Sequence, residues 1–271
     1  MPLRIATWNI NSVRLRIELV ARFLRDWSPD VLCLQETKCP EGQFPSAPLH
    51  ELGYSHIAER GQKGYHGVAI VSRLPLADIE SRNFCGKEDC RHVAATVATP
   101  SSRVTVHNFY VPAGGDDPDP KANEKFAHKL DFLKELADWS QGGAKARDRH
   151  RILVGDLNVA PLEHDVWSHR ELLKVVSHTP VETGLLDRVL ADGKWTDVMR
   201  QHVPADRKLY TWWSYRAKDW AQSDRGRRLD HVWSSAALAA RSKGIEVVRE
   251  ARSWPRASDH VPVIASFSAE I

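Results

Sequence analysis

Residues 151–162 read RILVGDLNVAPL, and this stretch decides the fold that we expect. The apolar run 152–154 predicts a buried strand, and Asp156 and Asn158 follow it two positions apart. Alternate residues of a strand face the same side of a sheet. The stretch therefore predicts a buried strand that ends by presenting a carboxylate and an amide side by side.

Strand-like apolar runs alternate with stretches of helical periodicity on both sides of this segment. We expect helices over residues 14–26, 121–139, 163–176 and 185–190. We expect strands over residues 3–10, 31–34, 56–59, 68–72, 93–98, 104–111, 152–158, 209–213, 229–233, 245–250 and 261–267. This alternation predicts the α/β class, with packed sheets, helices outside and one domain over residues 1–271.

The composition is typical of a globular protein with a sizeable core. Apolar residues make up 42% of the chain, and no apolar run approaches the roughly 20 residues that span a bilayer. The first residues, MPLRIATWNI, lack the layout of a signal peptide, and the four cysteines form no C-x-x-C pair. We therefore expect an intracellular, cytoplasmic protein with reduced thiols and no membrane contact.

The net charge of +3 is too small to indicate a nucleic-acid-binding protein, so the local distribution of charge is more informative. We interpret the basic residues at 145, 147, 149 and 151 as solvated loop charge. A second cluster interleaves basic with aromatic side chains: Trp212, Trp213, Tyr215, Arg216, Lys218, Trp220, Arg225, Arg227 and Arg228. Such a mixture suits a partner with phosphates and stackable bases.

Polar residues recur where the predicted strands end, as Asp156 does. They are Asn9, Asn11, Glu36, Tyr110, Asp230, Asp259 and His260. Each alone has an ordinary structural explanation, such as a turn asparagine or a core tyrosine. Active sites of α/β proteins gather at strand ends, and converging carboxylates need a cation. Oxygen ligands favour Mg²⁺ or Mn²⁺, so the set predicts a metal-assisted reaction at a phosphate.

The order of these motifs resembles the exonuclease III group of abasic-site endonucleases, within the endonuclease/exonuclease/phosphatase superfamily. The matching segments are TWNINSVR (7–14), PDVLCLQETK (29–38), YHGVAIVSR (65–73), NFYVP (108–112), ILVGDLNVAP (152–161), YTWWSYR (210–216), RRLDHVWSS (227–235) and ASDHVPV (257–263). The resemblance implies a four-layer α/β sandwich, in which two packed mixed sheets are flanked by helices. It also implies a Mg²⁺- or Mn²⁺-dependent DNA repair hydrolase.

The implied substrate is double-stranded DNA, cleaved 5′ to abasic sites, with some relatives also removing 3′ nucleotides or 3′ blocking groups. By the same resemblance, Glu36 is the main metal ligand, with Asn11 and Asp259 near the metal. Asp156 orients and deprotonates the attacking water, and Asn158 holds the nucleophile or a phosphate oxygen.

The remaining implied roles concern the phosphate and the pocket. His260 contacts the scissile phosphate and is held by Asp230, while Asn9 and Tyr110 contact the phosphate or the leaving oxygen. The substrate-binding residues are Trp212, Leu229 and Arg227, with Asn158. A monomer is expected, associated with the nucleoid if the source is bacterial.

Two features depart from the pattern of the relatives. The loop after Pro112 is acidic, AGGDDPD over residues 113–119, and would repel DNA phosphates at close range. Arg227 stands where some relatives have an apolar or aromatic pocket residue. Two alternatives stay open: a phosphoesterase of the same superfamily acting on a phosphate substrate other than nucleic acid, and a non-catalytic nucleic-acid-binding protein.

Overall fold

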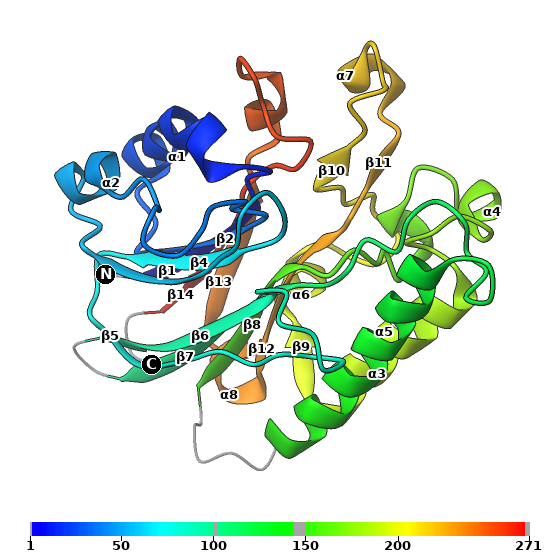
Figure 1. Cartoon of the computed structure of the whole chain (residues 1–271), viewed down its shortest axis with the longest axis horizontal. Coiled ribbons are helices and arrows are strands. Elements are labelled where there is room, and N and C mark those ends of the chain that lie inside the picture. The colour runs from blue at the N-terminus through cyan, green and yellow to red at the C-terminus, as the bar shows by residue number, and fades with distance from the viewer. Residues whose placement is uncertain (1, 100–101, 144–149, 269–271) are drawn as a thin grey trace.

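A computed structural model describes residues 2–99, 102–143 and 150–268. Over these ranges the chain forms two six-stranded mixed sheets that pack face to face, with helices on the outer faces of both (Figure 1). This is the four-layer α/β sandwich that the sequence predicts, and that prediction is confirmed. No helix in the described ranges is both long enough and apolar enough to cross a membrane.

The first sheet has the strand order β13-β14-β1-β2-β4-β3. Its strands are β1 (Leu3–Asn9), β2 (Val31–Gln35), β3 (His56–Arg60), β4 (Val68–Ser72), β13 (Ser242–Val247) and β14 (Val263–Phe267). Helices α1 (Val13–Trp27) and α2 (Ala47–Glu51) lie on its outer face (Figure 1). Strand β1 runs parallel to β2 and antiparallel to β14, so β1 and β2 end at the same edge.

The second sheet has the order β5-β6-β7-β8-β12-β9. Its strands are β5 (Leu76–Glu80), β6 (His92–Ala98), β7 (Arg103–Tyr110), β8 (Arg151–Asp156), β9 (Trp195–Asp197) and β12 (Asp230–Ser235). Helices α3 (Glu124–Gly143) and α5 (Pro180–Asp192) cover its outer face (Figure 1). Strand β8 pairs with β7 in parallel and with β12 antiparallel.

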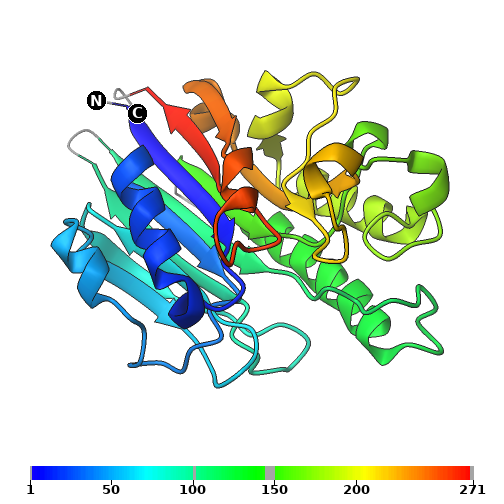
Figure 2. The same ribbon diagram turned by 90° about the horizontal axis from the view of Figure 1, so that it is seen from above.

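Short elements complete the edge of the sandwich where the strands end. The two-stranded ribbon of β10 (Trp212–Trp213) and β11 (Gly226–Arg227), with α7 (Trp220–Ser223) at its tip, rises above the sheets (Figures 1 and 2). The other short elements are η1 (Glu163–Asp165), α4 (His169–Leu172), α6 (Val198–His202), α8 (Ala236–Ala239) and η2 (Arg249–Ser253).

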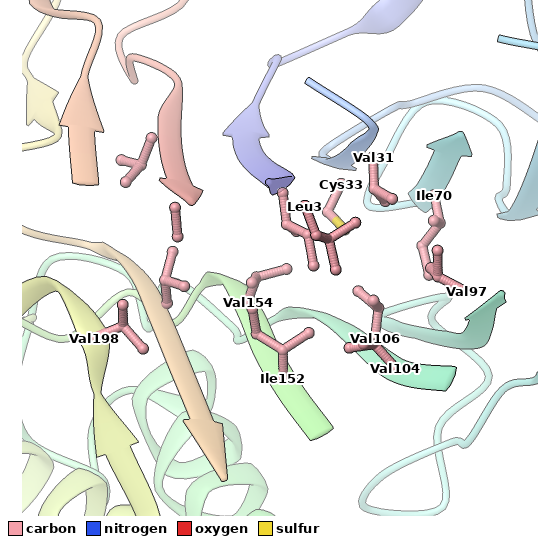
Figure 3. Close-up of a cluster of buried hydrophobic side chains, with 14 of the residues drawn as sticks. Leu3, Val31, Cys33, Ile70, Val97, Val104, Val106, Ile152, Val154 and Val198 are labelled. Carbon is pink, nitrogen blue, oxygen red and sulfur yellow. The ribbon is translucent and has the colours of Figure 1, made fainter. Parts of the chain in front are cut away.

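The largest apolar cluster lies between the two sheets (Figure 3). Cys33 and Ile70 from the first sheet meet Val104, Val106 and Ile152 from the second, and all are fully buried. Branched side chains suit this place because strands covered on both faces need apolar residues throughout. Separate apolar clusters pack α1 against the first sheet and α3 and α5 against the second.

Several predicted element boundaries are wrong in the second half of the chain. The helix expected over residues 163–176 is a 3₁₀ turn followed by the short α4, because Ser168 caps a new helix start by accepting from the Glu171 N–H. The apolar residues there pack in a separate small cluster with Leu229. The strand expected over 209–213 is reduced to β10, and β13 ends at Val247 before η2.

The basic run before β8 is described only at its end. Residues 145, 147 and 149 lie outside the described ranges. Arg151 is buried, and its guanidinium lies 4.5 Å from the centroid of the Trp195 ring. The interpretation as solvated loop charge is therefore wrong for Arg151, whose long side chain packs over an aromatic ring.

A buried histidine in β6 makes the stability of the fold depend on pH. His92 stacks on Phe109, and its Nδ1 has no hydrogen-bond partner. Burial, reinforced by His107 and Arg82, holds the pKa of His92 well below its ordinary value. The unfolded chain therefore binds more protons below about pH 6.5, so the free energy of unfolding falls as the pH drops through this range.

We expect His92→Phe to remove this part of the pH dependence. The slope of unfolding free energy between pH 6.5 and 5 should drop by up to about 1.4 kcal/mol per pH unit. Urea unfolding at each pH measures it, and His50→Gln on the exposed side of α2 is the matched control. An unchanged slope in His92→Phe would show that other groups cause the acid sensitivity.

Candidate active site

Polar residues that end the strands of both sheets meet at one edge of the sandwich. In the second sheet, the register sets Tyr110 beside Asp156 on one side and Asp230 beside Asp156 on the other. In the first sheet, the pairing of β1 with β2 sets Asn9 beside the residue before Glu36. Residues that are far apart in the sequence therefore gather at one place because the strands that carry them end together.

Asn9 links the two sheets at this edge. Its Nδ2 donates to Glu36 Oε1 (3.0 Å) and to Asp156 Oδ2 (2.8 Å). Its Oδ1 accepts from the Asn11 backbone N–H (3.0 Å), and its backbone carbonyl accepts from Ser258 Oγ (2.7 Å). This fully buried amide holds two carboxylates, one from each sheet, that would otherwise repel each other.

A buried carboxylate–imidazole pair faces Asp156. His260 Nδ1 lies 2.8 Å from Asp230 Oδ2, and His260 Nε2 lies 3.6 Å from Asp156 Oδ2. Burial disfavours a charged imidazole, but Asp230 and Asp156 outweigh it and raise the pKa of His260 to about 10. Burial, together with the nearby Asp230 and Glu36, raises the pKa of Asp156 to about 7 against the attraction of His260. A cationic imidazole thus lies beside a carboxylate whose affinity for a proton is raised by burial.

Asn158 lies against Asp156 for a reason other than strand alternation. Strand β8 ends at Asp156, and Asn158 has a backbone φ of 54°, so the predicted strand through residue 158 is wrong. Asparagine tolerates this left-handed conformation better than most residues. Its Nδ2 donates to Asp156 Oδ2 (3.2 Å) and to the Val111 carbonyl (2.9 Å), and its backbone N–H donates to Asp156 Oδ1 (3.0 Å). A turn places the amide beside the carboxylate.

Lys38 contacts oxygen atoms of Glu36 and Asn11, and Asn11 in turn contacts Asp259. Its Nζ lies 2.9 Å from Glu36 Oε2 and 2.6 Å from Asn11 Oδ1, and Asn11 Nδ2 donates to Asp259 Oδ1 (3.3 Å). Burial opposes the charge of Glu36, but Lys38 and Asn9 outweigh it and lower the pKa of Glu36. A positive group thus already contacts two of the predicted metal ligands, so the donor set suits a cation.

Tyr110 is buried between charged neighbours. Arg91 donates to the Tyr110 carbonyl (3.3 Å), and its guanidinium lies 4.8 Å from the centroid of the phenol ring. Burial, together with Glu36 and Asp156, raises the pKa of Tyr110 far above its ordinary value. The phenol therefore stays protonated and can donate a hydrogen bond at neutral pH.

The polar cluster opens into a pocket of about 660 Å³. Its lining includes the polar residues Glu36, Asp156, Asn158, Asp259 and His260, and the predicted substrate-binding residues Trp212, Leu229 and Arg227. The Arg227 guanidinium lies 5.2 Å from the centroid of the Trp212 ring, and Nη1 donates to Ser177 Oγ (2.8 Å) and the Val176 carbonyl (3.1 Å). The lining also contains Arg216, Arg225 and, from the acidic loop, Asp116.

The basic and aromatic cluster of the second half divides into two parts. Arg216, Arg225 and Arg227 line the pocket. Arg228 is fully buried and pairs with Asp165 (Nε to Oδ1, 2.8 Å) and Asp197, so the prediction that this cluster serves a phosphate-rich partner is wrong for Arg228. Its guanidinium is occupied by these two carboxylates and is not free for a ligand.

Several residues that support the site were missed by sequence reasoning. Thr211 Oγ1 accepts from the backbone N–H groups of Leu229 and Asp230 (3.1 Å each), and Ser258 Oγ accepts from the His260 N–H (3.2 Å). Lys38 follows Glu36 by two positions within the quoted LQETK segment, which was a usable signal. The contacts of Thr211 carry no such signal, because they join segments that are distant in sequence.

Among the residues that the structure describes, two places could hold a metal ion. The oxygen atoms of Glu36, Asn11 and Asp259 are one. At the other, one ligand atom each from Asp156, Asp230 and His260 lies within 4.8 Å of the others. Because Asp230 and His260 already bind each other, the harder donor set of Glu36, Asn11 and Asp259 suits Mg²⁺ or Mn²⁺ better.

A two-sheet sandwich with this cluster at one edge matches a known class of hydrolase. The family model described as the Endonuclease/Exonuclease/phosphatase family matches residues 6–260, and the chain belongs to this family. Exodeoxyribonuclease III of Haemophilus influenzae is 30% identical over 276 residues, covering 98% of this chain and 100% of that protein. The DNA repair nuclease APEX1 of Danio rerio is 27% identical over 96% of this chain and 81% of its own length.

Solved structures agree with these relatives. An AP endonuclease from Archaeoglobus fulgidus has a TM-score of 0.89 at 33% identity, covering 98% of this chain and 99% of that one. The 3′ phosphatase NExo from Neisseria, bound to a product DNA hairpin, has a TM-score of 0.89 at 34% identity with the same coverage. The predicted kinship with the exonuclease III group is confirmed, and with it the enzyme class, a nuclease among the hydrolases.

Proposed function

We propose that the protein is a divalent-metal-dependent DNA repair nuclease that cleaves duplex DNA 5′ to abasic sites. We further propose that it acts on 3′ ends as a 3′–5′ exonuclease and as a 3′-phosphodiesterase or phosphatase. The observation that carries the proposal is the facing pair of His260 and Asp156 inside a pocket lined by aromatic and guanidinium groups. The relatives named above are DNA nucleases and a DNA 3′ phosphatase, which supports the same substrate class.

Asp156 and Asn158 are the proposed groups that act on the nucleophile. A carboxyl group with a pKa of about 7 can accept a proton from water near neutral pH. Asn158 lies against Asp156 and can orient the same water or a phosphate oxygen. The turn that holds Asn158 fixes this pair before substrate arrives, which lowers the entropic cost of orienting the water.

His260, Asn9 and Tyr110 are the proposed groups that contact the phosphate. Asp230 keeps the His260 ring in one orientation and favours its cationic form, which suits an anionic phosphate. Tyr110 stays protonated and can donate to a phosphate or leaving oxygen. Both N–H groups of Asn9 already bind Glu36 and Asp156, so its proposed contact with the phosphate requires one of these bonds to be exchanged. His260 is held by its buried partner Asp230, so this donor needs no reorganisation as charge develops.

Glu36, Asp259 and Asn11 are the residues that would hold Mg²⁺ or Mn²⁺. Their oxygens suit a hard cation, and the contacts of Lys38 with two of them show that this place attracts positive charge. Such an ion supplies neutralisation of phosphate charge and polarisation of the bond that breaks. Without it, two carboxylates here would repel the substrate.

The pocket is the proposed site for the abasic sugar, which keeps its 5′-phosphate when the bond from phosphorus to the 3′-oxygen of the preceding nucleotide breaks. Trp212 and Leu229 offer an apolar surface, and Arg227, stacked on Trp212, adds a cation. An abasic sugar is extruded from a duplex at lower cost than a paired nucleotide, which favours abasic substrates. We also propose that residues 1–271 act as one catalytic domain and a monomer, because both sheets of one chain complete the site. The proposed location is the cytoplasm, at the nucleoid in a bacterial cell.

A gel assay on matched substrates tests the proposal. Duplexes would carry an abasic site, a recessed 3′ end or a 3′-phosphate, and inositol phosphates with phosphate release would form a separate arm. Incision 5′ to the abasic site that depends on Mg²⁺ is the expected result. Phosphate release from inositol phosphates without DNA cleavage would replace this proposal with a phosphoesterase of another substrate class.

A further inference from the structure

A buried ion pair lies behind the site, between the two helices that cover the second sheet. Lys129 from α3 pairs with Glu182 from α5, and both side chains are fully buried. Neither residue lines the pocket. Taking two charges out of water is costly, and an apolar pair of similar volume often gives equal stability. Unlike an apolar pair, these charged groups form hydrogen bonds to the loops that line the pocket.

Lys129 holds two loops that line the pocket. Its Nζ donates to the backbone carbonyls of Asn158 (2.8 Å) and Ala113 (3.3 Å), and the bond to Glu182 gives it a third acceptor. An ammonium has three N–H donors, so its hydrogen-bonding capacity is filled. Gly114 has a φ of +90°, and a Cβ added there would lie 2.8 Å from Lys129 Cδ, so the loop that contains Ala113 packs directly on the lysine stem.

Glu182 holds a third loop of the pocket. Its carboxylate accepts from the Ser177 N–H (2.9 and 3.0 Å), the Thr179 N–H (3.2 Å) and Thr179 Oγ1 (2.6 Å). Ser177 Oγ in turn accepts from Arg227, which stacks on Trp212. The wall of the pocket is therefore bonded, through the Lys129–Glu182 pair, to the turn that carries Asn158.

We propose that Lys129 and Glu182 are positioning residues that set the spacing between the Asn158 turn, the loop of residues 113–115 and the loop of residues 175–179. The proposal rests on the proposed function, in which the Asn158 turn acts on the nucleophile and the loop of residues 175–179 supports the sugar pocket. It assigns a role in the reaction to two residues that touch no reacting atom. A displacement of about 1 Å at such a site can cost roughly 100-fold in rate.

The test replaces both charges together, because Lys129→Met alone would leave a buried carboxylate without its partner. We expect the double variant Lys129→Met/Glu182→Gln to stay folded and to show a kcat lowered by about 10- to 100-fold, with KM changed less than threefold. Val104→Ala, in the core between the sheets and far along β7 from Tyr110, is the control for lost stability. It should keep its kcat at temperatures where it is folded.

Hydrogen exchange of the backbone amides gives a second readout that needs no activity. Residues 113–115 and 175–179 should exchange faster in the double variant and not in Val104→Ala. Unchanged exchange and a kcat within threefold of the parent would overturn the proposal. Because exchange is measured without substrate, a wild-type protein that cleaves no abasic DNA would defeat the proposed function and leave this test standing.

Glu182→Gln alone covers the case in which the double variant does not fold, because Lys129 loses its counter-charge but keeps all three hydrogen-bond acceptors. It keeps an amide oxygen for Lys129 and removes the second acceptor used by Thr179 and Ser177. The expected result is faster exchange confined to residues 175–179 and a kcat lowered by about tenfold. Wild-type exchange in that loop together with wild-type kcat would also overturn the proposal.

Discussion

Asp156→Asn is expected to lower kcat for cleavage of an abasic-site duplex by about 10³- to 10⁴-fold. Asparagine keeps the size of the side chain and an oxygen that can still accept from Asn9, but it cannot take a proton from water. Single-turnover cleavage measured by gel separates this loss of chemistry from a change in DNA binding.

A control variant separates the expected loss of cleavage by Asp156→Asn from a loss caused by unfolding. Asp26→Asn, the same substitution on the outer surface of α1 where the side chain pairs with Arg22, should stay within twofold of the parent. Duplex binding by Asp156→Asn, measured by fluorescence anisotropy, should be as tight as for the parent or tighter, because one negative charge near the phosphate is lost. Cleavage within a few-fold of the parent would remove Asp156 from the role of general base.

Removal of divalent metal by EDTA is expected to reduce cleavage by more than about 10³-fold, and added Mg²⁺ should restore it. Glu36 and Asp259 then lie near a phosphate without a metal ion to offset their charge. The substrate would meet like charges where the reaction needs neutralisation. The same gel assay over a series of Mg²⁺ and Mn²⁺ concentrations measures the effect and ranks the two ions.

A binding readout makes the metal prediction independent of activity. A ligand that binds only the folded state raises the midpoint of thermal unfolding, so millimolar Mg²⁺ should stabilise the parent protein. Glu36→Gln should weaken this shift, whereas Glu163→Gln in η1 should keep it. Full cleavage in excess EDTA, or an equal Mg²⁺ shift in Glu36→Gln, would exclude the proposed ligand set.

The sequence predicted the grouping of the polar residues better than it predicted the element boundaries around them. Asn9, Glu36 and Tyr110 follow apolar runs and Asp230 stands at the start of one, and that local signal was enough to expect them together. The segment 163–176 has apolar residues at helical spacing, but Ser168 restarts the helix and the apolar residues join a cluster with Leu229. Tertiary packing overrides periodicity where a segment is too short to stabilise a helix alone.

The charged residues show most clearly what sequence alone does not reveal. Arg227 and Arg228 are adjacent, yet Arg227 lines the pocket while Arg228 is buried between Asp165 and Asp197. Nothing in the dipeptide distinguishes a ligand-facing charge from a structural one. The partners come from segments some 30 to 60 positions away, so only the fold assigns each charge its neighbours.

The sequence by itself determined that carboxylates, amides and one histidine stand next to apolar runs, because such runs and the polar residues beside them are local features. The tertiary structure decided how these groups are arranged. It brought His260 to 3.6 Å from Asp156, replaced the expected strand at Asn158 with a left-handed turn and buried Lys129 against Glu182 behind both. Proton affinities and distances depend on neighbours from distant segments, and those neighbours exist only when both sheets and the covering helices have packed.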